Sequence, residues 1–164
     1  MKYLSSIFSA IICTIFFVSC QPSAEQVKTS AESLNNIYKS VLEKYAELEN
    51  SYELCYAETM DNALANLNSE IAKATEELNK FQMVSGCEPL FNAVKSSIEV
   101  YKSIAEKDSK EQVRMYKVPD EEFTEELRNS WDQIAKSVET RTKDANASVE
   151  KAYNEVSKLF TTAK

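Results

Sequence analysis

Apolar residues recur at helical spacing along most of the chain. Residues 23–85 contain neither proline nor glycine, and their apolar positions alternate steps of four and three, the spacing of one helix face. They form two series, which are Leu34, Tyr38, Val41, Tyr45, Leu48, Tyr52 and Cys55, and then Met60, Leu64, Leu67, Ile71, Ala74, Leu78 and Phe81. The series differ in phase near residues 56–60, which predicts a turn, a kink or a skip residue there.

Two breaks divide the rest of the chain. Residues 85–89, Ser-Gly-Cys-Glu-Pro, combine a glycine that suits a helix end with a proline that suits a helix start. A third helix follows, and residues 113–118 fit either its last turn or an extended connector that Pro119 ends. A fourth helix is expected from about residue 120 to within a turn of the C-terminus. Its apolar stripe comprises Phe123, Leu127, Trp131, Ile134, Val138, Ala145, Val149, Ala152, Val156 and Leu159.

These elements predict an all-α fold. The expected architecture is an antiparallel helical bundle, or an elongated coiled-coil-like assembly, of three to four long helices. A chain of 164 residues is long enough for one domain of ordinary size and too short for two.

The first twenty residues have the organisation of a targeting segment. Lys2 precedes an apolar run over residues 7–18, which is shorter than the ~20 residues of a membrane-spanning helix. The run ends in Phe17-Val18-Ser19-Cys20, which resembles the bacterial lipoprotein signal, where a small residue precedes a cysteine that is lipidated and becomes the mature first residue. The resemblance implies a signal peptide over residues 1–19 and a single helical domain over residues 20–164 with a lipidated N-terminus.

Acylation of Cys20 would anchor the chain in the bacterial cell envelope, since each buried methylene contributes about 0.8 kcal/mol. Residue 21 is Gln and not Asp, so the inner-membrane retention signal of enteric lipoproteins is absent. The resemblance therefore favours the outer membrane over the inner one. The alternative is a secreted protein that is cleaved nearby and keeps Cys20 as a thiol.

Two further cysteines, Cys55 and Cys87, belong to the helical domain. In an oxidising compartment such a pair often forms a disulfide, which is the prediction here. An unbroken helix between them would hold them about 48 Å apart, whereas a disulfide joins Cα atoms within about 7 Å. Either a hairpin turn lies between them, with the Asn-rich residues 62–69 as its best position, or both cysteines stay unpaired.

The composition excludes several classes of enzyme and argues against one class of binding partner. The chain has no histidine and a single glycine, which excludes histidine-based catalysis, His-zinc sites and glycine-rich phosphate loops. The formal charge is -7 and the pI about 4.8, which argues against nucleic-acid binding. We expect no catalytic residue, no metal and no cofactor. Residues 21–88 hold 12 acidic and 5 basic residues, which indicates either an acidic half next to the membrane or, as the favoured alternative, an ordinary solvated helix face.

Three groups of side chains have more than one interpretation. Asp120, Glu121, Glu122, Glu125 and Glu126 suggest a cation site, but acidic residues also stabilise the first turn of a helix. The tyrosines Tyr38, Tyr45, Tyr52 and Tyr56 form either a docking strip or the border of the core. Trp131, the sole tryptophan, is a core anchor or an interface residue.

The sequence favours a non-enzymatic envelope lipoprotein that is anchored by its N-terminal lipid and presents helical surfaces to a protein partner. The alternatives are a bundle that carries a small apolar ligand or lipid between its helices, and a structural spacer of the envelope.

Overall fold

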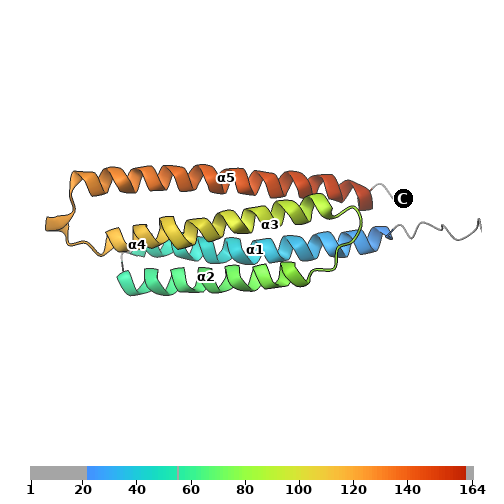
Figure 1. Cartoon of the computed structure of the whole chain (residues 1–164), viewed down its shortest axis with the longest axis horizontal. Helices are drawn as coiled ribbons and strands as arrows, with labels where there is room; N and C mark the ends of the chain where they lie inside the picture. The colour runs from blue at the N-terminus through green and yellow to red at the C-terminus, as the bar shows by residue number, and fades with distance from the viewer. Residues whose placement is uncertain (1–21, 55, 162–164) are drawn as a thin grey trace, which may run out of the picture.

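The computed structural model describes residues 22–54 and 56–161, and nearly all of these residues are helical (Figure 1). The helices are α1 (Ala24–Leu54), α2 (Ala57–Lys80), α3 (Glu88–Ser103), α4 (Lys110–Tyr116) and α5 (Glu125–Thr161). A π-helical segment, η2 (Ile104–Ser109), joins α3 to α4 without a break. A single 3₁₀ turn, η3 (Asp120–Glu122), precedes α5. The described chain thus forms four long helical rods.

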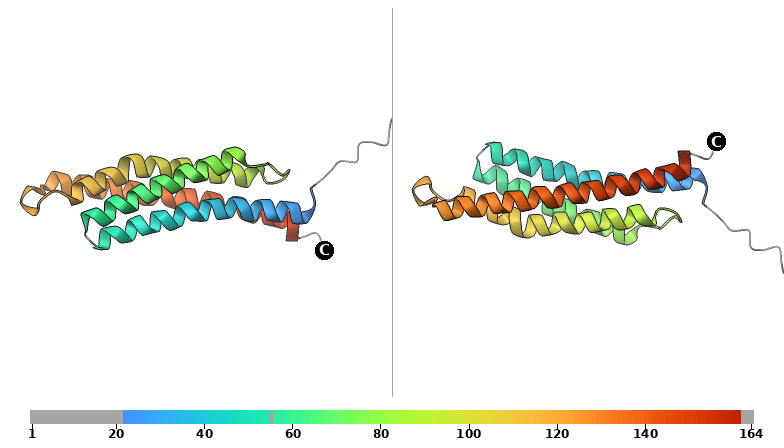
Figure 2. Two further views of the ribbon diagram at one scale, coloured as in Figure 1. Left: turned by 90° about the horizontal axis from the view of Figure 1, so that it is seen from below. Right: turned by 90° about the horizontal axis from the view of Figure 1, so that it is seen from above.

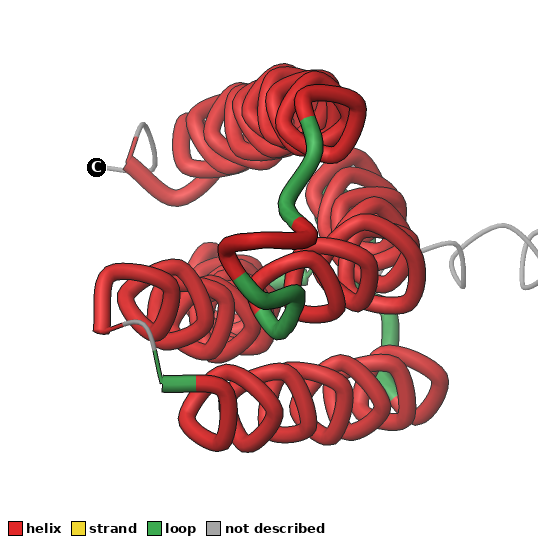
Figure 3. Tube along the Cα trace, turned by 90° about the vertical axis from the view of Figure 1, so that its left-hand side faces the viewer, coloured by secondary structure: helices red, strands yellow, loops and turns green. Residues whose placement is uncertain are grey.

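The rods pack in antiparallel order, and each view in Figures 1 and 2 shows an elongated bundle. The last residue of α1, the first of α2, the last of α4 and the first of α5 lie at one end, which we call the distal end. The start of α1, the end of α2, the start of α3 and the end of α5 lie at the other, the proximal end. Figure 3 shows α2 and α5 on opposite sides, with α1 and α3 between them.

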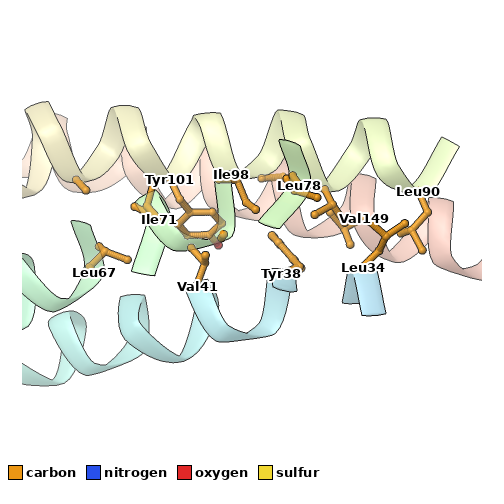
Figure 4. Packing of buried hydrophobic residues seen from close by; sticks show 14 of the residues in the cluster. Leu34, Tyr38, Val41, Leu67, Ile71, Leu78, Leu90, Ile98, Tyr101 and Val149 are labelled. Carbon is orange, nitrogen blue, oxygen red and sulfur yellow. The ribbon is translucent and has the colours of Figure 1, made fainter. Parts of the chain in front are cut away.

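The core runs along the centre of the bundle and takes residues from every long helix. Figure 4 shows Leu34 of α1, Leu90 of α3 and Val149 of α5 pointing toward one another. All three are buried, as are the members of the predicted α2 stripe at Met60, Leu67, Ile71, Ala74 and Leu78. Burying a Leu or Val side chain contributes about 1.5–3 kcal/mol, so this shared seam holds the four rods together.

Local signals fix where the helices begin. Ser23 and Gln26 form a reciprocal capping box before α1, in which the Gln26 N–H donates to Ser23 Oγ at 3.2 Å and the Ser23 N–H to Gln26 Oε1 at 2.8 Å. Thr124 Oγ1 accepts from the Leu127 N–H at 3.3 Å and so caps α5. Between α2 and α3, Gly86 adopts φ 95°, a left-handed conformation that glycine reaches at little cost.

The predicted all-α antiparallel bundle is confirmed, and the structure decides several alternatives within it. The phase shift near residues 56–60 is a turn between α1 and α2. A hairpin turn within residues 62–69 is wrong, because those residues lie inside the unbroken α2. The main fourth helix begins at Glu125 and not near residue 120, since Pro119 opens a 3₁₀ turn first and the Thr124 cap follows it. Of the two alternatives for residues 113–118, a last helical turn and an extended connector, the helical one holds for residues 113–116.

Within residues 22–54 and 56–161, no helix has the length and apolar character that crossing a bilayer requires.

Candidate functional site

An aromatic cluster joins three helices at the distal end. The ring of Tyr52 on α1 stacks on that of Tyr116 at the end of α4, with centroids 5.6 Å apart and planes 7° from parallel. The Trp131 ring of α5 stands edge-on to both, at 4.9 Å from Tyr116 and 5.9 Å from Tyr52. Such aromatic pairs contribute about 0.5–1.5 kcal/mol each beyond their buried area, so the cluster holds the distal ends of these three helices together.

A pocket of about 300 Å³ opens beside this cluster. Its walls come from the end of α4, the connector that follows and the first two turns of α5. The lining residues are Met115, Tyr116, Val118, Asp120, Phe123, Arg128 and Trp131. Apolar side chains therefore line most of the pocket, with one carboxylate and one guanidinium among them.

The pocket exists because α5 extends beyond its neighbours (Figure 1). A helix of 37 residues is about 55 Å long, whereas the 24 residues of α2 span about 36 Å. The first half of α5 consequently lacks a full set of packing partners, and its buried residues begin only at Val138. No residue between 117 and 137 is buried, although Leu127, Trp131 and Ile134 continue the apolar stripe.

Further large apolar side chains are exposed at the same end. Tyr56, just before α2, is 70% exposed, Leu54 is 58% exposed and Tyr116 is 39% exposed. Large apolar side chains that are exposed near one another are typical of interaction sites, and here three of them lie at one end of the bundle.

Two ion pairs brace the distal half. Lys117 Nζ lies 2.7 Å from both carboxylate oxygens of Asp61, so the connector after α4 is tied to the first turns of α2. Arg141 on α5 donates to Asp108 Oδ2 at 2.7 Å and to Ser103 Oγ at 3.2 Å, which ties α5 to the π-helical segment. The Lys117–Asp61 pair is exposed, and such pairs contribute only about 0–1 kcal/mol, whereas the Arg141–Asp108 pair is partly buried. Both pairs fix the relative positions of these elements.

Acidic residues are concentrated at the distal end. Residues 47–61 contain five acidic residues and no basic one, and residues 116–132 contain six acidic and two basic residues. Residues 106–115 hold three of each kind. The two acidic segments therefore have a net formal charge of -9, whereas the whole chain has -7. The acidic excess of α1 and α2 lies at the distal turn and not along a whole half of the bundle, because each of these helices runs along the bundle.

The acidic residues at 120–126 are exposed and occupy the 3₁₀ turn and the first turn of α5. They lie where the positive end of the helix dipole stabilises them. Among residues 22–54 and 56–161, no group of three or more Cys, Asp or Glu side chains has the arrangement of a metal site.

The tyrosine strip divides between the core and the surface. Tyr38 and Tyr52 are buried, Tyr45 is partly buried, and only Tyr56 is well exposed. Burial raises the pKa of Tyr38, Tyr45 and Tyr52 well above the ordinary tyrosine value. The strip as a whole is therefore part of the core, and its distal end is the part that reaches the candidate surface.

Of the predicted site residues, Cys20 and Cys55 lie outside the described residues, so lipidation and the Cys55–Cys87 disulfide stay predictions. Cys87 is buried at the proximal end, where its thiol approaches the Val27 carbonyl oxygen at 3.6 Å. Tyr56, which follows Cys55 in the sequence, lies at the distal end. Burial raises the pKa of the Cys87 thiol.

Sequence reasoning singled out Trp131 but missed its neighbour Tyr116. Tyr116 falls in residues 113–118, whose conformation the pattern left open, and nothing in the spacing indicates that it stacks on Tyr52. Arg128 and Asp120 became notable only once the turn before α5 brought them to one pocket.

Comparison with known proteins adds no family to this description. No protein-family model matches the chain, and no curated protein or solved structure shows significant similarity to it.

Proposed function

We propose that this protein is a cell-envelope lipoprotein, anchored through an acylated Cys20, whose helical bundle docks a protein partner at its distal end. The observation that carries the proposal is the apolar pocket beside Tyr116 and Trp131, which the fold leaves open at the end opposite the start of α1. Tyr56 is exposed at the same end.

The geometry suits a tethered module. Cys20 precedes the first described residue, Pro22, by two positions, and the described chain starts at the proximal end. A lipid at Cys20 holds that end at the membrane and leaves the distal surface roughly the length of α5, about 55 Å, from it. A partner therefore meets the distal end first.

The residues on that surface are those that dominate binding at protein interfaces. Tyrosine and tryptophan are enriched among hot-spot residues, because each offers a large contact area with few rotatable bonds. Tyr116 and the partly buried Trp131 lie together beside the distal pocket, and Tyr56 is a second exposed tyrosine at the same end of the bundle. The non-enzymatic part of the proposal rests on the residue inventory, since histidine is missing from the whole sequence.

Site-specific photo-crosslinking in the native envelope tests the proposal. A photoreactive phenylalanine analogue replaces Tyr56 or Phe123 at the distal end, and Lys143, an exposed residue on the middle of α5, serves as the matched control. We expect a discrete adduct of higher mass from both distal positions and none from position 143. Equal labelling at all three positions, or no adduct from either distal position, overturns the proposal.

A further inference from the structure

We propose that the distal pocket receives an apolar side chain from a partner segment whose flanking residues are lysine or arginine. This inference rests on the proposed function and deepens it, because it specifies the chemistry of the segment that docks.

The pocket has the size and lining for one or two apolar side chains. Its volume of about 300 Å³ is at the lower end of the range for ligand sites, which suits a side chain better than a large cofactor. Phe123 and Trp131 supply aromatic walls, and Met115 supplies a flexible apolar one. An aliphatic or aromatic side chain that enters between them is removed from water and contacts these three residues.

The surroundings of the pocket select the charge of the partner. Asp120 lines the pocket, and the four glutamates within positions 121–126 flank the lining residue Phe123 in the sequence; all five carboxylates are exposed. The acidic segment 47–61 lies at the same end of the bundle. A net charge of -9 over these two segments attracts a cationic segment and accelerates its association.

The same charge disfavours the other occupants. A second copy of this chain, docked distal end to distal end, would place two strongly acidic surfaces against each other. Anionic lipid headgroups and nucleic acids are repelled for the same reason. A basic protein segment is the partner class whose charge complements the pocket and its rim.

A short peptide probe tests the inference on the full-length lipidated protein in phosphatidylcholine vesicles. The probe is Lys-Lys-Leu-Phe-Lys-Lys, and the matched peptides are Glu-Glu-Leu-Phe-Glu-Glu and Lys-Lys-Ser-Ser-Lys-Lys. Fluorescence of Trp131, the sole tryptophan of the chain, reports binding, and vesicles without protein give the blank. We expect saturable binding of the first peptide alone, weakened as salt is raised.

Variants separate the pocket from its acidic rim. Phe123→Ser removes one wall of the pocket at a partly exposed position and is expected to weaken binding by about tenfold or more. Glu121→Gln, Glu122→Gln and Glu126→Gln together should weaken binding and flatten its salt dependence. The matched control, Glu139→Gln, Glu150→Gln and Glu155→Gln, removes the same charge from exposed positions elsewhere on α5 and should leave affinity nearly unchanged.

The outcomes distinguish this inference from the proposed function. Discrete photo-adducts at Tyr56 and Phe123 without binding of the Lys-Lys-Leu-Phe-Lys-Lys peptide would leave the docking function standing and overturn the basic partner. Equal binding of the acidic peptide would overturn the charge argument, and equal binding of the serine peptide would overturn the pocket. An equal effect of the two triple glutamine variants would show attraction to net charge alone and would also overturn the inference.

Discussion

The hydroxyl of Tyr101 on α3 donates a hydrogen bond of 2.9 Å to Oδ1 of Asn146 on α5. Tyr38 on α1 donates to the same oxygen. One amide oxygen therefore connects three rods of the bundle at mid-length, where Tyr38 and Tyr101 are both buried and their rings pack edge to face at 6.2 Å. Because both hydroxyls need an acceptor, this contact fixes the rotation of α5 relative to α1 and α3.

Replacing Asn146 with alanine should destabilise the protein more than removing either hydroxyl. Asn146→Ala removes two hydrogen bonds, for a cost of roughly 1–3 kcal/mol, whereas Tyr101→Phe removes one, for about 0.5–1.5 kcal/mol. Urea unfolding curves measure both, with Asn154→Ala, at an exposed position on α5, as the control. A cost for Asn146→Ala no larger than that of the control would show that the shared acceptor does not stabilise the fold.

Stability should fall at alkaline pH. Desolvation by burial is the main cause that raises the pKa of Tyr38, Tyr45, Tyr52 and Tyr101 above the ordinary value of about 10. Above that pH the unfolded chain loses tyrosine protons that the folded chain keeps, so the free energy of unfolding decreases as pH rises. Below pH 10 these groups are neutral in both states and their contribution is constant.

Circular dichroism, together with tyrosinate absorbance, would follow this transition. Tyr45→Phe removes one of the four groups and should make the alkaline decline shallower. Ionisation of every tyrosine near pH 10 without any loss of helix would contradict the burial argument.

The sequence predicted the helices well where a helix has neighbours along its whole length. The stripe from Met60 to Leu78 is buried as expected except for the partly buried Leu64, because α2 packs on α1 and on the α3–α4 rod. The stripe of α5 is equally regular, yet Trp131 and Ile134 are only partly buried. A periodic pattern describes one helix and carries no information on where the neighbouring helices end, so the distal pocket was not predictable from it.

Polar contacts between rods were missed for a related reason. Asn146 falls in an Asn-Ala-Ser triplet on a helical face, and a single polar residue gives no periodic signal. Its partners are more than forty residues away in the chain. The same is true of Lys117 and its partner Asp61. Such pairings follow from the register of the rods, which packing of the whole core determines.

Gly86→Ala should destabilise the turn between α2 and α3. Residue 86 has φ 95°, which costs a residue with a Cβ about 1–2 kcal/mol, and an added Cβ would lie 2.9 Å from Leu159 Cδ1. Leu159 is half exposed and can move, so the backbone dominates the cost. Thermal unfolding should show a smaller loss for Gly86→Asn, since asparagine tolerates this conformation better. Full rescue of Gly86→Ala by Leu159→Ala would instead assign the cost to the side-chain contact.

Cys87 should react slowly with alkylating reagents in the folded protein. Its thiol is buried and its pKa is raised by burial, so little thiolate is present or accessible near neutral pH. The unbroken α2 also separates Tyr56 from the proximal end that holds Cys87. This separation bears on the Cys55–Cys87 disulfide predicted from the sequence. An intact mass without reductant that is lower by two hydrogens would confirm the disulfide, and a mass with both thiols would contradict it.

Cys20→Ser should change two properties of the protein at once if Cys20 is the lipidated residue. The acyl chains have no attachment point, and residues 1–19 stay on the chain because cleavage of this type of signal follows acylation of the cysteine. Intact mass of the protein purified from its envelope should thus show the acylated chain beginning at Cys20 for the wild type and an unacylated precursor for the variant. Cys13→Ser, within the same signal, is the matched control and should be processed normally. An unacylated wild-type chain would remove the anchor and leave the distal surface on a freely diffusing protein, whose partner would then not be confined to the vicinity of a membrane.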